Sequence, residues 1–135
     1  MKLSAINFFL LIAAIILAGC ATTEKDSRME TLSKTTDKYR NAIRWGLYET
    51  AENLREAGGD KDRSNLERLK KIKVTAYKSV HRDVSENGTV AKHIIEIKYY
   101  HIDYMVEKTI IDKQLWKYNS DKKTWHLQSR LPEFK

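Results

Sequence analysis

The sequence predicts an α+β domain in which helices come first and four antiparallel strands follow. Two observations lead to this prediction. Apolar residues recur every three to four positions between residues 32 and 54, as in a helix, and every second position from Ile72, as in a half-buried strand. Asn87-Gly88 then separates two alternating stretches, and this dipeptide is the strongest short hairpin signal. Helices followed by hairpin-connected strands belong to the α+β class.

The helical stripe comprises Leu32, Thr36, Tyr39, Ile43, Leu47, Ala51 and Leu54. We expect the helix to begin near Ser27, because Ser27 and Glu30 have the spacing of a capping box. Gly46, directly after Trp45, costs about 1 kcal/mol relative to alanine in a helix. A kink or a break into two helices is therefore predicted at Gly46.

Residues 57–60 (Ala-Gly-Gly-Asp) predict a helix stop, with Gly58 at the left-handed C′ position. A second capping pair, Ser64 and Glu67, predicts a short helix that includes Leu66 and Leu69.

The first hairpin has a predicted register. If Asn87 and Gly88 form a two-residue turn of type I′, Val80 lies opposite Ile95, and Ala76 lies opposite Tyr99. Ile72, Val74, Ala76 and Val80 then share a face with Ile95, Ile97 and Tyr99. The same register predicts that Ile97 is buried and that Lys98 is exposed.

The remaining elements are a bend at residues 103–106, a strand at 108–118, a turn at 119–123 and a strand at 124–129. Pro132 closes the domain. Because Ile110 and Ile111 are adjacent, the pattern leaves open which face of the third strand is buried.

The N-terminus has the composition of a signal peptide. Fifteen of the first 19 residues are apolar, and Lys2 is the one charged residue among them. The apolar run from Ala5 to Ala18 is too short to cross about 30 Å of hydrocarbon as a helix. Without these 19 residues the net charge falls from +7 to +6.

Leu17-Ala18-Gly19-Cys20 resembles the lipobox of bacterial lipoproteins, and the chain has one cysteine. The resemblance implies that the Cys20 thiol accepts diacylglycerol and that cleavage makes Cys20 the new N-terminus, whose amine is usually acylated too. Residues 1–19 are then the signal peptide, residues 20–27 a lipidated and unstructured tether, and residues 28–135 a single domain. The alternatives are an ordinary signal peptide with a chance cysteine, or an uncleaved anchor.

The resemblance also implies a location. Ala21, rather than an aspartate, follows Cys20, and in Gram-negative lipoproteins this favours the outer membrane, with the domain facing the periplasm. A Gram-positive host would instead hold the protein on the outer face of its membrane.

Residues 39–54 (Tyr-Arg-Asn-Ala-Ile-Arg-Trp-Gly-Leu-Tyr-Glu-Thr-Ala-Glu-Asn-Leu) resemble the helix, glycine bend and second helix of the cystatin-like, NTF2-like superfamily. The resemblance implies an N-terminal helical segment packed on a curved four-stranded antiparallel sheet. Leu47 stands where an acidic residue is common in that superfamily, so the resemblance does not extend to a deep pocket.

Catalytic candidates are few. Cys20 is used for the lipid, which leaves no thiol nucleophile. His101 and Asp103 are two residues apart, so they can point to one face as base and orienter. His93 and His101 lie about 27 Å apart on an extended strand, so they cannot share a metal. No metal is predicted for these reasons, and no cofactor is predicted because the five glycines form no phosphate-binding loop.

Aromatic and basic residues offer binding surfaces. Tyr99, Trp116 and Trp125 can line a groove between sheet and helix, although aromatics at strand spacing more often pack the sheet. Lysines cluster at residues 70–73 and 122–123. Nucleic acid is not an expected partner of an exported lipoprotein. The first interpretation of the lysine clusters is that they are solvated faces. The second is that they contact anionic lipid or an envelope polymer.

The sequence therefore favours a lipid-anchored cell-envelope binding or accessory module without catalytic activity. Its expected partners are membrane lipid, through acylated Cys20, and an envelope protein. One alternative is a small NTF2-like hydrolase or isomerase with a cone-shaped pocket. The other is a structural envelope lipoprotein. A closed polar pocket holding His101 and Asp103 would favour the enzyme, and an exposed apolar patch would favour a partner surface.

Overall fold

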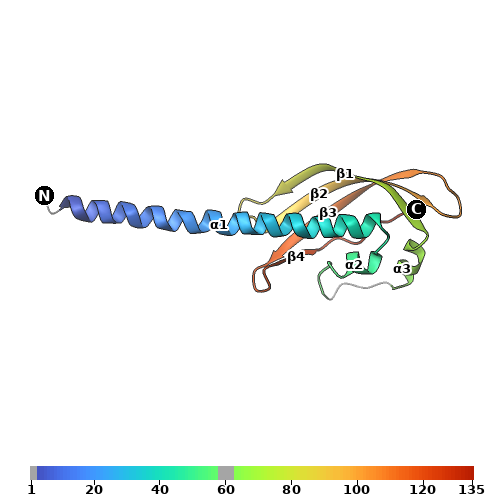
Figure 1. The fold of residues 1–135 in the computed structure, drawn as a ribbon, viewed down its shortest axis with the longest axis horizontal. Helices are drawn as coiled ribbons and strands as arrows, with labels where there is room; N and C mark the ends of the chain where they lie inside the picture. Colours follow the sequence, from blue (N-terminus) through green and yellow to red (C-terminus); the bar gives the residue numbers. More distant parts are fainter. Residues whose placement is uncertain (1–2, 58–62) are drawn as a thin grey trace.

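The computed structural model of the chain describes the backbone of residues 3–57 and 63–135 and the side chains of residues 22–57 and 65–135. Its elements are α1 (Leu3–Arg44), α2 (Tyr48–Glu52), α3 (Arg63–Leu69), β1 (Ile72–Val84), β2 (Val90–His101), β3 (Lys108–Asn119) and β4 (Thr124–Leu127). The strands form one antiparallel sheet in the order β1-β2-β3-β4, and the C-terminal half of α1 lies against one face of it (Figure 1). The predicted α+β class and the helix-on-sheet arrangement are confirmed.

Helix α1 is continuous through the segment that was expected to be an unstructured tether. The predicted start at Ser27 is therefore wrong, and residues 21–27 are helical. They contain neither glycine nor proline, and an ion pair between Glu24 and Arg28 (3.3 Å) has the i,i+4 spacing that supports a helix. No helix in the described part of the chain is long and apolar enough to cross a membrane.

The predicted break at Gly46 is confirmed. Gly46 has φ +70°, a conformation that glycine adopts without steric cost. Its N–H donates to Ile43 O (3.3 Å) and the N–H of Leu47 donates to Ala42 O (2.8 Å), which is the hydrogen-bond pattern of a Schellman C-cap. Because the chain turns here, Leu47 leaves the helical stripe and its side chain is 55% exposed, contrary to the prediction.

The short helices carry the chain from α1 to the sheet. Helix α2 ends at Glu52, before the predicted stop, and Gly58, the predicted C′ residue, lies outside the described residues. Helix α3 confirms the predicted short helix, with Leu69 buried and Leu66 half-buried. The side chain of its predicted cap, Ser64, also lies outside the described residues.

The first hairpin has a longer loop, residues 85–89, in place of the predicted two-residue turn. The N–H of Ser85 donates to Val90 O, and the N–H of Gly88 donates to Ser85 O, both at 2.8 Å. Gly88 has φ +67°, whereas Asn87 is not among the described residues with positive φ, so the turn is not type I′. The Oδ1 atom of Asn87 instead accepts hydrogen bonds from the N–H (3.2 Å) and the hydroxyl (2.8 Å) of Thr89.

Two irregularities in β1 change the predicted register. Pairing follows the prediction from Val84 to His81, then shifts between Ser79 and His81 and again between Val74 and Ala76. Ile95 therefore pairs with Ser79, Tyr99 pairs with Val74, and Val80 is 56% exposed. Each extra residue in β1 is a bulge, which re-aims the side chains that follow it.

The face covered by α1, called here the inner face, holds the core. Along β2 its buried residues are Ala91, His93, Ile95, Ile97 and Tyr99. Lys98 is exposed, so the predicted burial of Ile97 and exposure of Lys98 are confirmed. On β3 the inner residues are Ile110, Asp112, Gln114 and Trp116, whereas Ile111 is 53% exposed on the other face.

The other predicted turns are present. A turn follows His101, whose carbonyl accepts from the N–H groups of Tyr104 (3.0 Å) and Met105 (2.9 Å). Asn119 Oδ1 organises the turn before β4. Strand β4 ends at Leu127 instead of the predicted Ser129. Pro132 is buried in the C-terminal segment.

Candidate functional site

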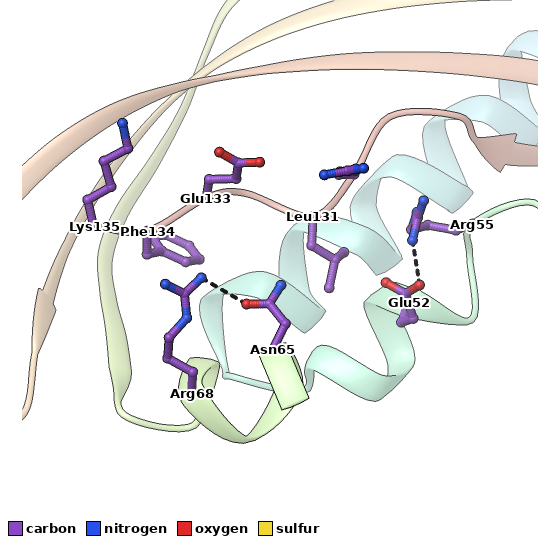
Figure 2. Close-up of a pocket in the computed structure, with 9 residues that line it drawn as sticks. Glu52, Arg55, Asn65, Arg68, Leu131, Glu133, Phe134 and Lys135 are labelled. Carbon is purple, nitrogen blue, oxygen red and sulfur yellow. Dashed lines mark hydrogen bonds and ion pairs between the residues drawn. The ribbon is translucent and has the colours of Figure 1, made fainter. Parts of the chain in front are cut away.

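A cavity of about 470 Å³ lies where the end of α2, helix α3 and the C-terminal segment meet (Figure 2). It is lined by Glu52, Arg55, Asn65, Arg68, Arg130, Leu131, Glu133, Phe134 and Lys135. Apart from Leu131 and Phe134 these side chains are charged or polar, so the cavity suits a charged ligand better than an apolar one.

The charges around the cavity are partly neutralised by their neighbours. Arg55 Nη1 lies 2.6 Å from Glu52 Oε1, and Arg55 Nε donates to Ser129 O at 3.1 Å. Because Glu52 is only 6% exposed, this ion pair mainly offsets the cost of burying the Glu52 carboxylate. Arg68 Nη2 donates to Asn65 Oδ1 at 2.9 Å.

The lining of the cavity carries more positive than negative charge. Its cationic residues are Arg55, Arg68, Arg130 and Lys135, and its acidic residues are Glu52 and Glu133. This excess of positive charge suits an anionic ligand.

A second polar cluster lies on the inner face of the sheet. Gln114 Nε2 donates to Asp112 Oδ2 (2.7 Å) and to the hydroxyl of Tyr77 (2.9 Å), and Trp116 Nε1 donates to Gln114 Oε1 (3.2 Å). The hydroxyl of Tyr39, on α1, is buried without a hydrogen-bond partner. The sequence did not identify this cluster, because the buried face of β3 was open. The pairing of Ile97 with Ile110 would have assigned Asp112 and Gln114 to the inner face.

Burial shifts the protonation of this cluster. It raises the pKa of Asp112 to about 6, although the hydrogen bond from Gln114 acts in the opposite direction. In His93, on the neighbouring strand, burial and the nearby charge of Arg82 lower the pKa to about 4. Because Asp112 is 7% and His93 3% exposed, both groups are shielded from solvent, and we interpret them as parts of the core.

The structure does not arrange His101 and Asp103 as a catalytic pair. His101 Nδ1 and Asp103 Oδ2 are 3.7 Å apart, too far for a hydrogen bond. Asp103 Oδ2 instead pairs with Lys71 Nζ at 2.9 Å, and Lys71 lowers the pKa of that carboxyl. The Nδ1 atom of His101 accepts from the main-chain N–H of Asp103 at 3.2 Å. The two side chains lie at an exposed turn because their strand ends at His101.

The three aromatic residues proposed to line a groove are core residues. Tyr99 is 1%, Trp116 0% and Trp125 2% exposed. Tyr99 packs edge-on against Phe134, and Trp116 packs in the same way against Tyr39. Trp116 and Trp125 contact α1 through Tyr39 and Arg28, whereas Tyr99 contacts Phe134 and Lys135 of the C-terminal segment, so the predicted groove is not formed by them.

Exposed apolar side chains gather at the β2–β3 turn. They are Ile102, Tyr104, Met105 and Val106, with exposed fractions between 42% and 75%. They flank Asp103 in the sequence, on the turn where His101 was expected to act as a base. Single exposed apolar residues are ordinary, whereas several within one turn are typical of a contact surface.

Cys20 and metal binding are the remaining subjects of the sequence-based predictions. Cys20 lies within α1, and its side chain is outside the described set. In the part of the chain with described side chains, no three histidine, cysteine, aspartate or glutamate residues are grouped closely enough to hold a metal ion.

Comparison of the chain with protein-family models, with curated proteins and with solved structures finds no match in any of the three.

Proposed function

We propose that this chain is a lipid-anchored cell-envelope binding or accessory module that faces the periplasm and has no catalytic activity. The anchor is diacylglycerol on Cys20, at the end of the lipobox Leu17-Ala18-Gly19-Cys20. Two or three acyl chains, at about 0.8 kcal/mol per buried methylene, make such an anchor effectively permanent.

The continuity of α1 supports a short and stiff connection to the membrane. Arg28 comes eight positions after Cys20, and at a rise of about 1.5 Å per residue this is about 12 Å of helix. Arg28 already contacts the folded domain, because its Nη1 donates to Asn87 O at 3.0 Å. The domain would therefore stand close to the bilayer, with the β1–β2 turn at its near end.

One observation favours a binding module over an enzyme. The best acid–base pair in the sequence, His101 and Asp103, lies on an exposed turn among Ile102, Tyr104 and Met105. A catalytic pair needs a site that excludes water, whereas exposed apolar side chains at a turn suit a protein partner.

The anchor is tested by expressing the full chain in a Gram-negative host and measuring its intact mass. We expect the mass of a chain that starts at Cys20 and carries diacylglycerol. Cys20→Ala should leave an unprocessed precursor, because no other thiol can accept the lipid, and Ser27→Ala is the matched control that should be processed normally. A wild-type chain without added lipid would overturn the proposal.

The membrane is tested with Ala21→Asp. If the rule for residues that follow a lipidated cysteine applies here, wild type fractionates with the outer membrane and Ala21→Asp with the inner membrane. Identical fractionation of the two would contradict the assignment to the outer membrane, although it would leave the lipid anchor intact.

A further inference from the structure

The face of the sheet opposite α1, called here the outer face, is not covered by any described helix. Figure 1 shows α1, α2 and α3 on one side of the sheet, and the strands arch over α1. The outer face is therefore, as far as the structure describes the chain, open to solvent.

Six exposed lysines lie on the outer face. Along β2 the buried inner residues have odd numbers, so the even-numbered residues from Val90 to Tyr100 point to the outer face. Residues directly opposite in an antiparallel sheet share a face, which extends the assignment to β1 and β3. The exposed lysines assigned in this way are Lys73, Lys78, Lys92, Lys98, Lys113 and Lys117.

The strand register places one lysine in each of six consecutive cross-strand rows. Two of the six, Lys92 and Lys98, belong to β2 itself. The other four rows follow from direct pairing: Lys73 opposite Tyr100, Lys78 opposite Glu96, Lys113 opposite Ile94 and Lys117 opposite Val90. Successive rows are about 6.8 Å apart, so the series extends about 34 Å along the sheet.

None of the six forms an ion pair with any described residue, whereas Lys34, Lys70 and Lys71 each pair with a carboxylate. The same rows contain two acidic residues, Asp83 and Glu96. The six rows therefore carry a net charge of +4, out of +7 for the whole chain. Unpaired charge of one sign along a surface attracts a partner of the opposite sign.

We propose that the outer face binds a linear anionic glycan of the cell envelope along this row of lysines. Regular spacing over six rows suits a polymer with repeating charges better than a small anion. Lysine presents a point charge on a flexible stem and does not require the planar, bidentate geometry that arginine recognises. Between the lysines, Tyr100, Ile94 and Ile111 offer apolar surface against which sugar rings can pack.

The length of the series and the expected location favour a glycan over other polyanions. The six rows extend about 34 Å along the sheet, a distance that a chain polymer can follow from end to end. The preference for a glycan over a nucleic acid rests on the proposed envelope location.

The test uses the full-length protein in neutral detergent, with polygalacturonate as the probe and uncharged dextran as the blank. We expect binding to polygalacturonate that weakens about tenfold between 50 and 300 mM salt, because counterions are released on binding. The triple variant Lys78→Gln, Lys98→Gln, Lys113→Gln should bind on the order of tenfold more weakly.

The matched control is Lys34→Gln, Lys38→Gln, Lys122→Gln, which lowers the net charge by the same amount on other surfaces. It should bind within about twofold of wild type. Thermal unfolding of both triple variants checks that they fold, since exposed substitutions of this kind cost little.

Equal weakening in the two triple variants would overturn the proposal, because attraction to overall charge would then explain binding. Tighter binding to poly-glutamate, to an oligothymidylate or to phosphatidylglycerol in the micelle would also overturn it in favour of that class. Absence of binding at 50 mM salt would overturn it outright. The intact mass of the same preparation reports lipidation separately, so lipidated protein that does not bind refutes this inference alone.

Discussion

The guanidinium of Arg28 donates a hydrogen bond to the main-chain oxygen of Asn87, 3.0 Å away and 59 residues later in the chain. The main-chain oxygen of Arg28 accepts another from the indole of Trp125 at 2.9 Å. Its guanidinium also lies over the ring of Tyr118, 5.3 Å from the centroid. One residue of α1 thus links the turn after β1 and the hairpin of β3 and β4 to the helix.

A chain that begins at Arg28 should therefore fold without the residues that precede it. We expect a cooperative thermal transition, because the buried part of α1 begins at Leu32. A chain that begins at Thr31 loses the contacts of Arg28 and should be less stable by on the order of 1–3 kcal/mol. If the chain that begins at Arg28 shows no cooperative transition, the boundary of the domain is wrong.

Gly88→Val should destabilise the fold by about 1–3 kcal/mol, measured by urea unfolding, because a β-branched residue resists φ +67°. A Cβ atom at Gly88 would also lie 3.1 Å from Lys25 Cγ, although that side chain can move. Glu86→Val, in the same loop but without positive φ, is the control and should stay within about 0.5 kcal/mol. Equal costs for the two variants would mean that backbone strain at Gly88 is not the cause.

Ile97→Ala should cost about 2–5 kcal/mol, because Ile97 is fully buried on the inner face. Lys98→Ala, one residue further along the same strand, should stay within about 0.5 kcal/mol because its side chain is exposed. Chemical unfolding of both variants provides the comparison. A reversed order would place the core on the outer face.

Ionisation of Asp112 should lower the free energy of unfolding as the pH rises. Its pKa is about 6 in the folded protein, against an ordinary value of 3.8, so between these values the folded state holds a proton that the unfolded chain has lost. The stability that this group contributes is complete below about pH 4 and is lost as the pH passes 6. Asp112→Asn should therefore raise the free energy of unfolding at pH 7.5 by roughly 1–3 kcal/mol and have little effect at pH 4.

His93 should have the opposite effect. Its pKa is about 4 in the folded protein, against an ordinary value of 6.5, so the unfolded chain takes up the proton first as the pH falls. Stability from the neutral ring is complete above about pH 6.5 and is lost toward pH 4. Urea unfolding between pH 4.5 and 7.5 gives the free energy of unfolding of each variant relative to wild type. As the pH rises, this difference should increase for Asp112→Asn and decrease for His93→Gln. Parallel curves for the two variants would contradict both assignments.

Features that depend on a few neighbouring residues could be predicted from the sequence. The break at Gly46 needs only a glycine next to a helical stripe, and the alternation around Ile97 needs only a half-buried strand. The resemblance of Leu17-Ala18-Gly19-Cys20 to a lipobox is also local, and the anchor at Cys20 stays a prediction. The α+β class followed because two hydrophobic periods succeed each other along the chain.

What required tertiary structure was the alignment between segments. Bulges in β1 moved Ile95 opposite Ser79, and no pattern within β1 alone specifies them. Asp112 is buried because β3 pairs with β2 in one register, which a one-residue slip would reverse. The row of outer-face lysines likewise exists only once three strands are in register, since its members are spread from Lys73 to Lys117. Charge and burial on a sheet are shared across strands, so the tertiary structure decided them.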